Sequence, residues 1–141
     1  MLNFNTHKRG LFGKRLTQDD LLSWSKEPIG KPLMRTMDKI LKKEAPEIFK
    51  LIQTYMGDKK SKQIASLNTC LELTTKGWSL PSIRDELYLQ LIKQTSYNLS
   101  AESLQRGWEL MGKRKNATRA LNASRALLRS SGVSFIFSTV E

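Results

Sequence analysis

The feature that most constrains the fold is the spacing of the apolar residues between positions 17 and 111. They recur at intervals of three and four residues, which is the period of an α-helix with one buried face. No segment in this region shows the strict alternation of a half-buried β-strand. The sequence therefore predicts an all-α fold here, a compact helical bundle.

Local signals predict where the first helices begin and end. Thr17 opens a capping-box pattern, which predicts a short helix after it. The prolines and glycine of residues 28–32 predict an extended connector. Thr36 is expected to cap a second helix, which Pro46 interrupts or kinks and Gly57 terminates.

Three further helices are expected after a charged turn over residues 58–62. Gly77 is expected to stop the first of them, Pro81 to occupy the first turn of the second, and Ser100 to cap the third. The side chains expected to be buried are Ile64, Leu67 and Leu71 in the first helix, with the small thiol of Cys70 beside them, Ile83, Leu87, Tyr88, Leu91 and Ile92 in the second, and Leu104, Trp108 and Met111 in the third.

The positive charge of the chain is concentrated at its two ends. The formal net charge is +11, yet residues 1–15 hold four basic residues and no acid, and residues 113–141 hold six basic residues and one acid. We therefore expect a basic N-terminal segment over residues 1–16, a helical domain over residues 17–111 and a basic tail over residues 112–141.

Catalytic, cofactor and metal sites are not predicted. The chain has one histidine, His7, and one cysteine, Cys70, which excludes an intramolecular disulfide and a multi-cysteine zinc site. Asp85 and Glu86 are neighbours that diverge by about 100° on a helix, so they suit capping or dipole compensation better than a shared catalytic site. No apolar run is long enough to span a bilayer, and the expected location is cytoplasmic.

The remaining candidate site is a basic surface that would attract acidic partners. Residues 38–62 contain seven lysines and only four acidic residues. The alternative interpretation is an ordinary solvated helix face that keeps the chain soluble. The candidate partner-binding residues are Lys39, Lys42, Lys43, Lys50, Lys59, Lys60 and Lys62.

Three blocks of the sequence, residues 49–58, 83–95 and 106–111, resemble the successive hallmarks of the myosin tail homology 4 domain. The resemblance implies a helical bundle that acts as a non-catalytic adaptor and binds microtubules or the tails of partner proteins, without a cofactor or a small-molecule substrate. The family hallmark positions are Tyr55, Met56, Gly57, Asp58, Arg84, Asp85, Glu86, Leu87, Tyr88, Gln94 and Trp108. Among them, residues 84–86 are expected to stabilise the fold through caps and ion pairs between helices.

The flanking residues 1–5 and 24–29 resemble the Vilse/CrossGAP branch of Rho GTPase-activating proteins. This implies a signal-transduction parent that is associated with the cytoskeleton and whose GTPase-activating domain is absent from residues 1–141. After Met111 the sequence departs from the family, which continues into helices that close the bundle. We therefore expect a truncated isoform with an incomplete bundle of marginal stability, because the missing helices would leave apolar surface uncovered.

The alternative function is that of a basic protein that binds nucleic acid through its charged ends. No motif that combines basic and aromatic residues in the manner of a known nucleic-acid reader occurs in the chain. The interaction module is therefore the preferred interpretation, and nucleic acid is not the expected partner.

Overall fold

Helices make up most of the residues that the computed structural model describes, which are 3–6, 16–60 and 67–112. They are α1 (Gln18–Leu21), α2 (Lys39–Met56), α3 (Leu67–Ser79), α4 (Pro81–Thr95) and a further helix over residues 101–112. In these residues the only strand-like pairing is an isolated antiparallel bridge between Phe4 and Met34. The predicted all-α bundle is therefore confirmed for the described part of the chain.

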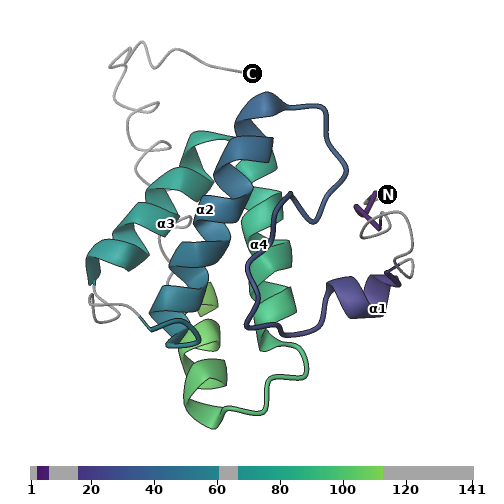
Figure 1. The fold of residues 1–141 in the computed structure, drawn as a ribbon. Helices are drawn as coiled ribbons and strands as arrows, with labels where there is room; N and C mark the ends of the chain where they lie inside the picture. Colours follow the sequence, from purple (N-terminus) through teal and green to yellow (C-terminus); the bar gives the residue numbers. More distant parts are fainter. Residues whose placement is uncertain (1–2, 7–15, 61–66, 113–141) are drawn as a thin grey trace, which may run out of the picture.

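The centre of the bundle is formed by α2, α3 and α4, each of which packs against the other two. Figure 1 shows that α2 and α4 run in the same direction, whereas α3 runs the opposite way and helix 101–112 returns along the lower half of the bundle. The side chains of the shared core are Leu41, Ile48, Ile52, Tyr55, Met56, Cys70, Leu73, Ile83, Leu87, Leu91 and Leu110.

Several predicted helix ends are confirmed. The Thr17 hydroxyl accepts a hydrogen bond from the Asp20 backbone N–H at 3.1 Å, and the Asp20 carboxylate accepts one from Thr17 N–H in return. Gly57 ends α2 with a φ of +82°, a left-handed conformation that favours glycine. Pro81 is the first residue of α4, where its missing N–H costs nothing.

The start of α2 differs from the prediction. Asp38, not Thr36, caps this helix, because the Asp38 carboxylate accepts hydrogen bonds from the backbone N–H groups of Ile40 (2.8 Å) and Leu41 (3.3 Å). The Thr36 hydroxyl instead accepts a hydrogen bond from the Asp38 backbone N–H at 3.0 Å. Thr36 therefore orients the residue that caps α2.

Pro46 does not interrupt α2, which is continuous from Lys39 to Met56. The core residues Leu41 and Ile48 lie on either side of the proline and are both buried. Their packing holds the two halves of α2 in one helix despite the hydrogen bond that a proline removes.

The prediction for α3 was wrong in its end point and in its buried face. The helix continues past Gly77 to Ser79, and Leu67 and Leu71 are 70% and 55% exposed. Cys70, which was included in the predicted buried face, is buried, and it faces the core together with Leu73 and Gly77. At about 100° per residue, Cys70 lies about 60° and Leu73 about 120° from Leu67 around the helix, so the buried face is rotated from the predicted leucine stripe.

The buried face of α4 is largely the predicted one, whereas that of helix 101–112 is rotated from the prediction. Ile83, Leu87 and Leu91 are buried as expected, but Ile92 and Trp108 are exposed. Helix 101–112 turns Gly107 toward the core, where a Cβ atom would lie 2.7 Å from Cγ2 of Thr95. The close contact at this glycine moves Trp108 to the outer surface.

Some predictions concern residues outside those that the structure describes. They are the basic N-terminal residues around His7, the candidate partner-binding residue Lys62, Ile64, which was expected to be buried, and the basic tail beyond Gly112. In the described ranges, none of the helices is both long enough and apolar enough to cross a membrane.

Candidate partner-binding surface

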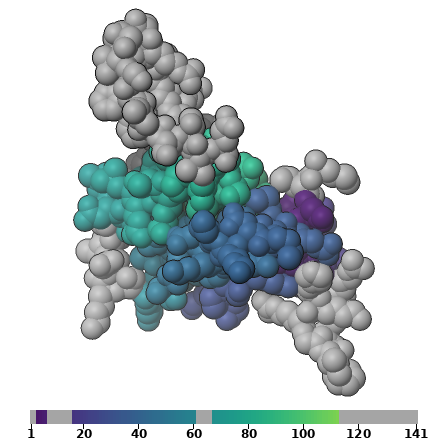
Figure 2. Space-filling model, turned by 90° about the horizontal axis from the view of Figure 1, so that it is seen from above, coloured from purple at the N-terminus to yellow at the C-terminus, as the bar shows by residue number. Residues whose placement is uncertain are grey.

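The lysines of α2 form a ridge along one side of the helix. Lys39, Lys42, Lys43 and Lys50 are all exposed. At about 100° per residue these four positions fall within an arc of about 100°, and at about 1.5 Å per residue they extend over roughly 16 Å. We call these four residues the lysine ridge. Figure 2 shows the start of α2 on one side of the described molecule, with α3 and α4 on the other.

The other predicted lysines do not belong to this ridge. Lys59 and Lys60 are exposed, but they follow Gly57 at the opposite end of α2. The structure therefore divides the predicted basic face into the lysine ridge and a separate pair at the C-terminal end of the helix.

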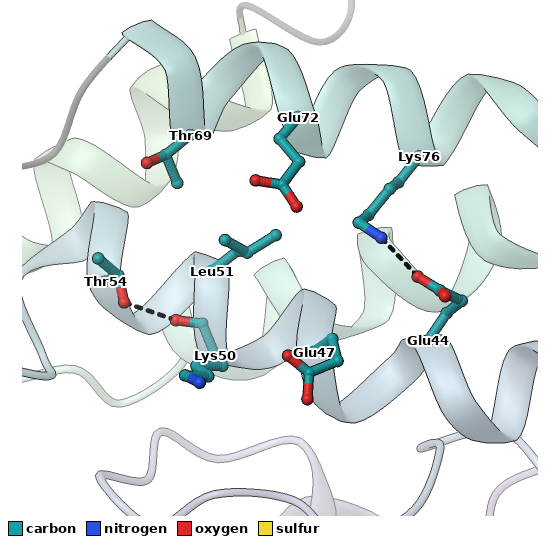
Figure 3. Close-up of a pocket in the computed structure, with 8 residues that line it drawn as sticks. All are labelled: Glu44, Glu47, Lys50, Leu51, Thr54, Thr69, Glu72 and Lys76. Atoms are coloured by element: carbon teal, nitrogen blue, oxygen red, sulfur yellow. Dashed lines mark hydrogen bonds and ion pairs between the residues drawn. The ribbon is translucent and has the colours of Figure 1, made fainter. Parts of the chain in front are cut away.

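Beside the ridge, a groove of about 310 Å³ runs between α2 and α3. Its lining residues are Glu44, Glu47, Lys50, Leu51, Thr54, Thr69, Glu72 and Lys76 (Figure 3). The ammonium group of Lys76 lies 2.6 Å from the Glu44 carboxylate and joins the two walls. Because Lys76 compensates Glu44, this carboxylate weakens the positive potential of the ridge less than an unpaired acid would.

Asp58 is a hallmark residue that connects several segments of the bundle. Its carboxylate accepts hydrogen bonds from the indole N–H of Trp24 (3.1 Å), the side-chain amide of Gln94 (3.2 Å) and the hydroxyl of Ser103 (2.6 Å). These donors come from the connector between α1 and α2 (residues 22–38), from α4 and from helix 101–112. Asp58 thus joins three segments at the end of α2, and its role is structural.

Two buried glutamines hold the connector against the bundle. The Gln53 amide donates to the backbone carbonyl of Lys26 at 3.0 Å. The Gln94 amide donates to the carbonyl of Ser25 at 3.1 Å, and its oxygen accepts from Ser25 N–H at 3.2 Å. The hallmark role of Gln94 is explained by these bonds, whereas Gln53 was not predicted, because no local pattern indicates that its partners lie 26 to 28 residues away.

Glu86 is fully buried, and its carboxylate accepts hydrogen bonds from the backbone N–H groups of Leu33 (2.7 Å) and Met34 (3.0 Å) and from the Gln90 amide (3.0 Å). Burial raises the pKa of Glu86, and these hydrogen bonds oppose the rise. The adjacent Asp85 is exposed. Neither carboxylate lies in the first turn of α4, so the predicted dipole compensation is wrong.

The predicted ion pairs of residues 84–86 are also not formed. Ion pairs between other described residues do occur, as in Lys76–Glu44 and Arg106–Glu102. Arg84 donates a hydrogen bond to the Gly77 carbonyl at 3.3 Å, and its guanidinium lies 5.8 Å from the Trp78 ring centroid. Arg84 therefore joins α4 to α3 by a hydrogen bond and a cation–π contact.

The remaining hallmark residues divide between core and surface. Tyr55, Met56 and Leu87 are core residues, Tyr88 is half-buried, and Trp108 is exposed. In the described ranges no three His, Cys, Asp or Glu residues are grouped so that they could hold a metal ion, and the Cys70 thiol is buried. The lysine ridge and its groove are one surface that this arrangement offers to other molecules, and it is suited to binding.

Comparison with known proteins identifies the domain. Residues 70–127 match the MyTH4 domain family, and this match continues past Met111, after which a departure from the family was predicted. The chain is 33% identical over 104 residues to the high molecular weight form of myosin-1 of Acanthamoeba castellanii, a match that covers 74% of this chain and 6% of the relative. It is also 33% identical over 117 residues to the kinesin-like protein KIN-14I of Oryza sativa subsp. japonica, covering 74% of this chain and 9% of the kinesin.

Solved structures show the same fold. The C-terminal MyTH4-FERM domain of human myosin 7b, in complex with the harmonin-a PDZ3 domain, superposes with a TM-score of 0.61 at 32% identity and covers 75% of this chain and 24% of its own. The MyTH4-FERM MF2 domain of Dictyostelium discoideum myosin VII gives a TM-score of 0.61 at 32% identity, covering 74% and 20%. The chain spans less than a tenth of the length of the myosin-1 and kinesin relatives. The helices described above are those of a MyTH4 domain, which this chain carries.

Proposed function

We propose that this MyTH4 domain is a non-catalytic interaction module that binds acidic surfaces of the cytoskeleton through the lysine ridge. Microtubules, whose tubulin subunits end in acidic tails, are the first partner to test, and acidic tails of signalling proteins are the second. A location on the cytoskeleton follows from this proposal.

The observation that carries the proposal is the alignment of Lys39, Lys42, Lys43 and Lys50 on one exposed side of α2. A row of lysines on a rigid helix attracts an acidic polymer over long range and offers it several contacts at once. The relatives support this choice, because they are myosins and a kinesin, and the human myosin 7b domain was solved with a protein partner.

A pair of charge-matched variants tests the proposal by co-sedimentation with microtubules. Lys39→Glu/Lys43→Glu reverses two charges on the ridge, and Lys26→Glu/Lys31→Glu reverses two exposed charges on the connector. We expect the ridge variant to bind roughly tenfold more weakly or worse, and the connector variant to bind nearly as the unmodified chain does. Equal losses in both variants would show that net charge, not the ridge, holds the microtubule.

The nucleic-acid alternative depends on other residues and is separated by deletion. Removal of residues 113–141 takes away six basic residues and one acid. We expect microtubule binding to survive this deletion or to improve. Loss of binding to the polymer, together with loss of binding to duplex DNA, would favour the alternative in which the charged ends act.

The finer part of the proposal is a Rho GTPase-activating parent of the Vilse/CrossGAP type. It is supported by the resemblance of residues 1–5 and 24–29 to that branch, and residue 112 is proposed as the start of an alternative tail. Sequencing of the transcripts tests both points. An exon boundary at residue 112 and a GTPase-activating domain in the longer transcript are expected, and a myosin motor domain upstream would overturn the assignment.

A further inference from the structure

Two large apolar side chains project from one end of the bundle, on the turn between α4 and helix 101–112. Leu99 is 99% exposed and Tyr97 is 81% exposed. Figure 1 shows this turn at the end of the molecule where α2 also finishes. A single exposed leucine is ordinary on a protein surface, so the meaning of this pair depends on how it is held and what surrounds it.

The turn that carries them is held in one conformation. Tyr97 has a φ of +55°, a left-handed conformation that is rare for an aromatic residue. The side-chain amide of Asn98 donates to the Gln94 carbonyl (3.0 Å) and to the Ser103 hydroxyl (2.8 Å), and its oxygen accepts from Ser100 N–H (2.9 Å). Tyr97 and Leu99 are therefore presented by a backbone that these bonds fix on both sides.

Exposed lysines lie at the same end of the bundle. The Ser103 hydroxyl donates to the Asp58 carboxylate at 2.6 Å, which places the residues after Gly57, including exposed Lys59 and Lys60, beside helix 101–112. The backbone N–H of Trp24 donates to the Ser96 carbonyl at 2.9 Å, which places the connector beside the turn. The two C-terminal helix ends found here, of α2 and α4, also favour positive charge nearby.

The acids at this end are largely engaged within the molecule. Asp58 accepts the three hydrogen bonds described above, and Glu102 forms an ion pair with Arg106 at 2.6 Å. Glu27, on the connector, is exposed beside Lys26. Exposed Lys59 and Lys60 therefore supply most of the uncompensated charge near the turn.

We propose that this end of the bundle docks on membranes that contain anionic lipids, with Tyr97 and Leu99 entering the interface and Lys59 and Lys60 pairing with lipid phosphates. The turn presents two exposed side chains that can enter another phase, rather than a pocket that would hold a small ligand. Leucine suits the acyl boundary, the tyrosine ring suits the headgroup level, and lysine is attracted to an anionic surface. The inference is independent of the microtubule proposal. The lysine ridge lies on α2, whereas Lys59 and Lys60 follow the end of that helix.

Co-sedimentation of the full chain with vesicles tests the inference. Vesicles of phosphatidylcholine alone are compared with vesicles that also contain phosphatidylserine. We expect binding only to the second kind, weakened about tenfold by Leu99→Ser together with Tyr97→Asn and about 25-fold by Lys59→Glu/Lys60→Glu. Asparagine is chosen at position 97 because it tolerates a positive φ.

Charge-matched and exposure-matched controls keep the test specific. Lys39→Glu/Lys43→Glu changes the net charge equally but lies on the ridge, and Met37→Ser removes another exposed apolar side chain. Both are expected to bind phosphatidylserine vesicles almost as the unmodified chain does. Equal losses in the ridge and the Lys59/Lys60 variants would overturn the inference, because binding would then follow net charge alone.

An environment-sensitive dye on Leu99→Cys gives a second readout that does not depend on affinity. Because the Cys70 thiol is buried, the introduced cysteine is the accessible one among the described residues. A blue shift of the dye on phosphatidylserine vesicles is expected at position 99 but not at Met37→Cys. Absence of a shift at position 99 on bound protein would overturn the inference and leave the turn as a candidate contact for another protein.

Discussion

The Oε1 atom of Glu86 lies 2.7 Å from the backbone nitrogen of Leu33, which precedes it by 53 residues. The second carboxylate oxygen accepts from Met34 N–H at 3.0 Å. Through these two bonds a buried acid on α4 fastens the connector, whose residues 33–35 also pair with residues 3–5. Glu86 therefore helps to determine the path of the chain into α2.

The raised pKa of Glu86 predicts a pH dependence of stability. Because burial raises the pKa above the ordinary value of 4.5, the folded chain binds this proton more tightly than the unfolded chain does. The contribution of Glu86 to the free energy of unfolding should therefore fall as the pH rises from about 4.5 through the higher folded pKa. Below that window and above it, this contribution should be constant.

Denaturation of the unmodified chain and of Glu86→Gln between about pH 4 and pH 8 measures this contribution as a difference. The stability advantage of the unmodified chain over the variant is expected to shrink as the pH rises. An advantage that grows with pH would mean that the hydrogen bonds from residues 33 and 34 outweigh burial and lower the pKa.

A side chain at Gly107 is predicted to destabilise the fold. A Cβ atom there would lie 2.7 Å from Cγ2 of Thr95 and 2.8 Å from Cε of Met56. Although alanine favours a helix over glycine by up to about 1 kcal/mol, the overlap should make Gly107→Ala destabilising by about 1–3 kcal/mol. Thermal or chemical denaturation measures the change.

Two further variants separate overlap from other causes. Gly112→Ala places a Cβ where nothing lies within 4 Å, so it should be neutral or stabilising. Thr95→Ser removes Cγ2 but keeps the hydroxyl that donates to the Leu91 carbonyl at 2.8 Å. This change should partly rescue Gly107→Ala, and a strictly additive double variant would contradict the contact between the two residues.

The rotated face of α3 predicts that two leucines two positions apart contribute very differently to the free energy of unfolding. Leu73 is buried in the core and Leu71 is 55% exposed. Leu73→Ala should lower the free energy of unfolding by about 2–5 kcal/mol, whereas Leu71→Ala should change it by about 0.5 kcal/mol. Chemical denaturation of both variants decides the question, and a larger loss at Leu71 would restore the buried face inferred from periodicity.

Local chemistry made much of the fold predictable. The caps at Thr17 and Gly57 and the start at Pro81 depend on contacts within a few residues, and all three are confirmed. The buried face of α3 was not predictable in the same way. Leu67, Leu71 and Leu73 are equally apolar, but only Leu73 is buried, so hydrophobicity alone does not indicate which side of the helix faces the core.

The contacts of the candidate site depend on partners distant in sequence. The lysine ridge could be predicted, because its residues share one helix, but its separation from Lys59 and Lys60 depends on where α2 ends. The bonds of Gln94 and Asp58 to the connector join residues more than thirty positions apart and leave no periodic signal. The resemblance marked both residues without indicating what they bind.

The most direct test of the central claim is the affinity of the full chain for microtubules before and after enzymatic removal of the acidic tubulin tails. If the lysine ridge binds those tails, removal should weaken binding roughly tenfold or more, and Lys39→Glu/Lys43→Glu should respond little to it. An unmodified chain that binds intact and trimmed microtubules equally well would contradict the account.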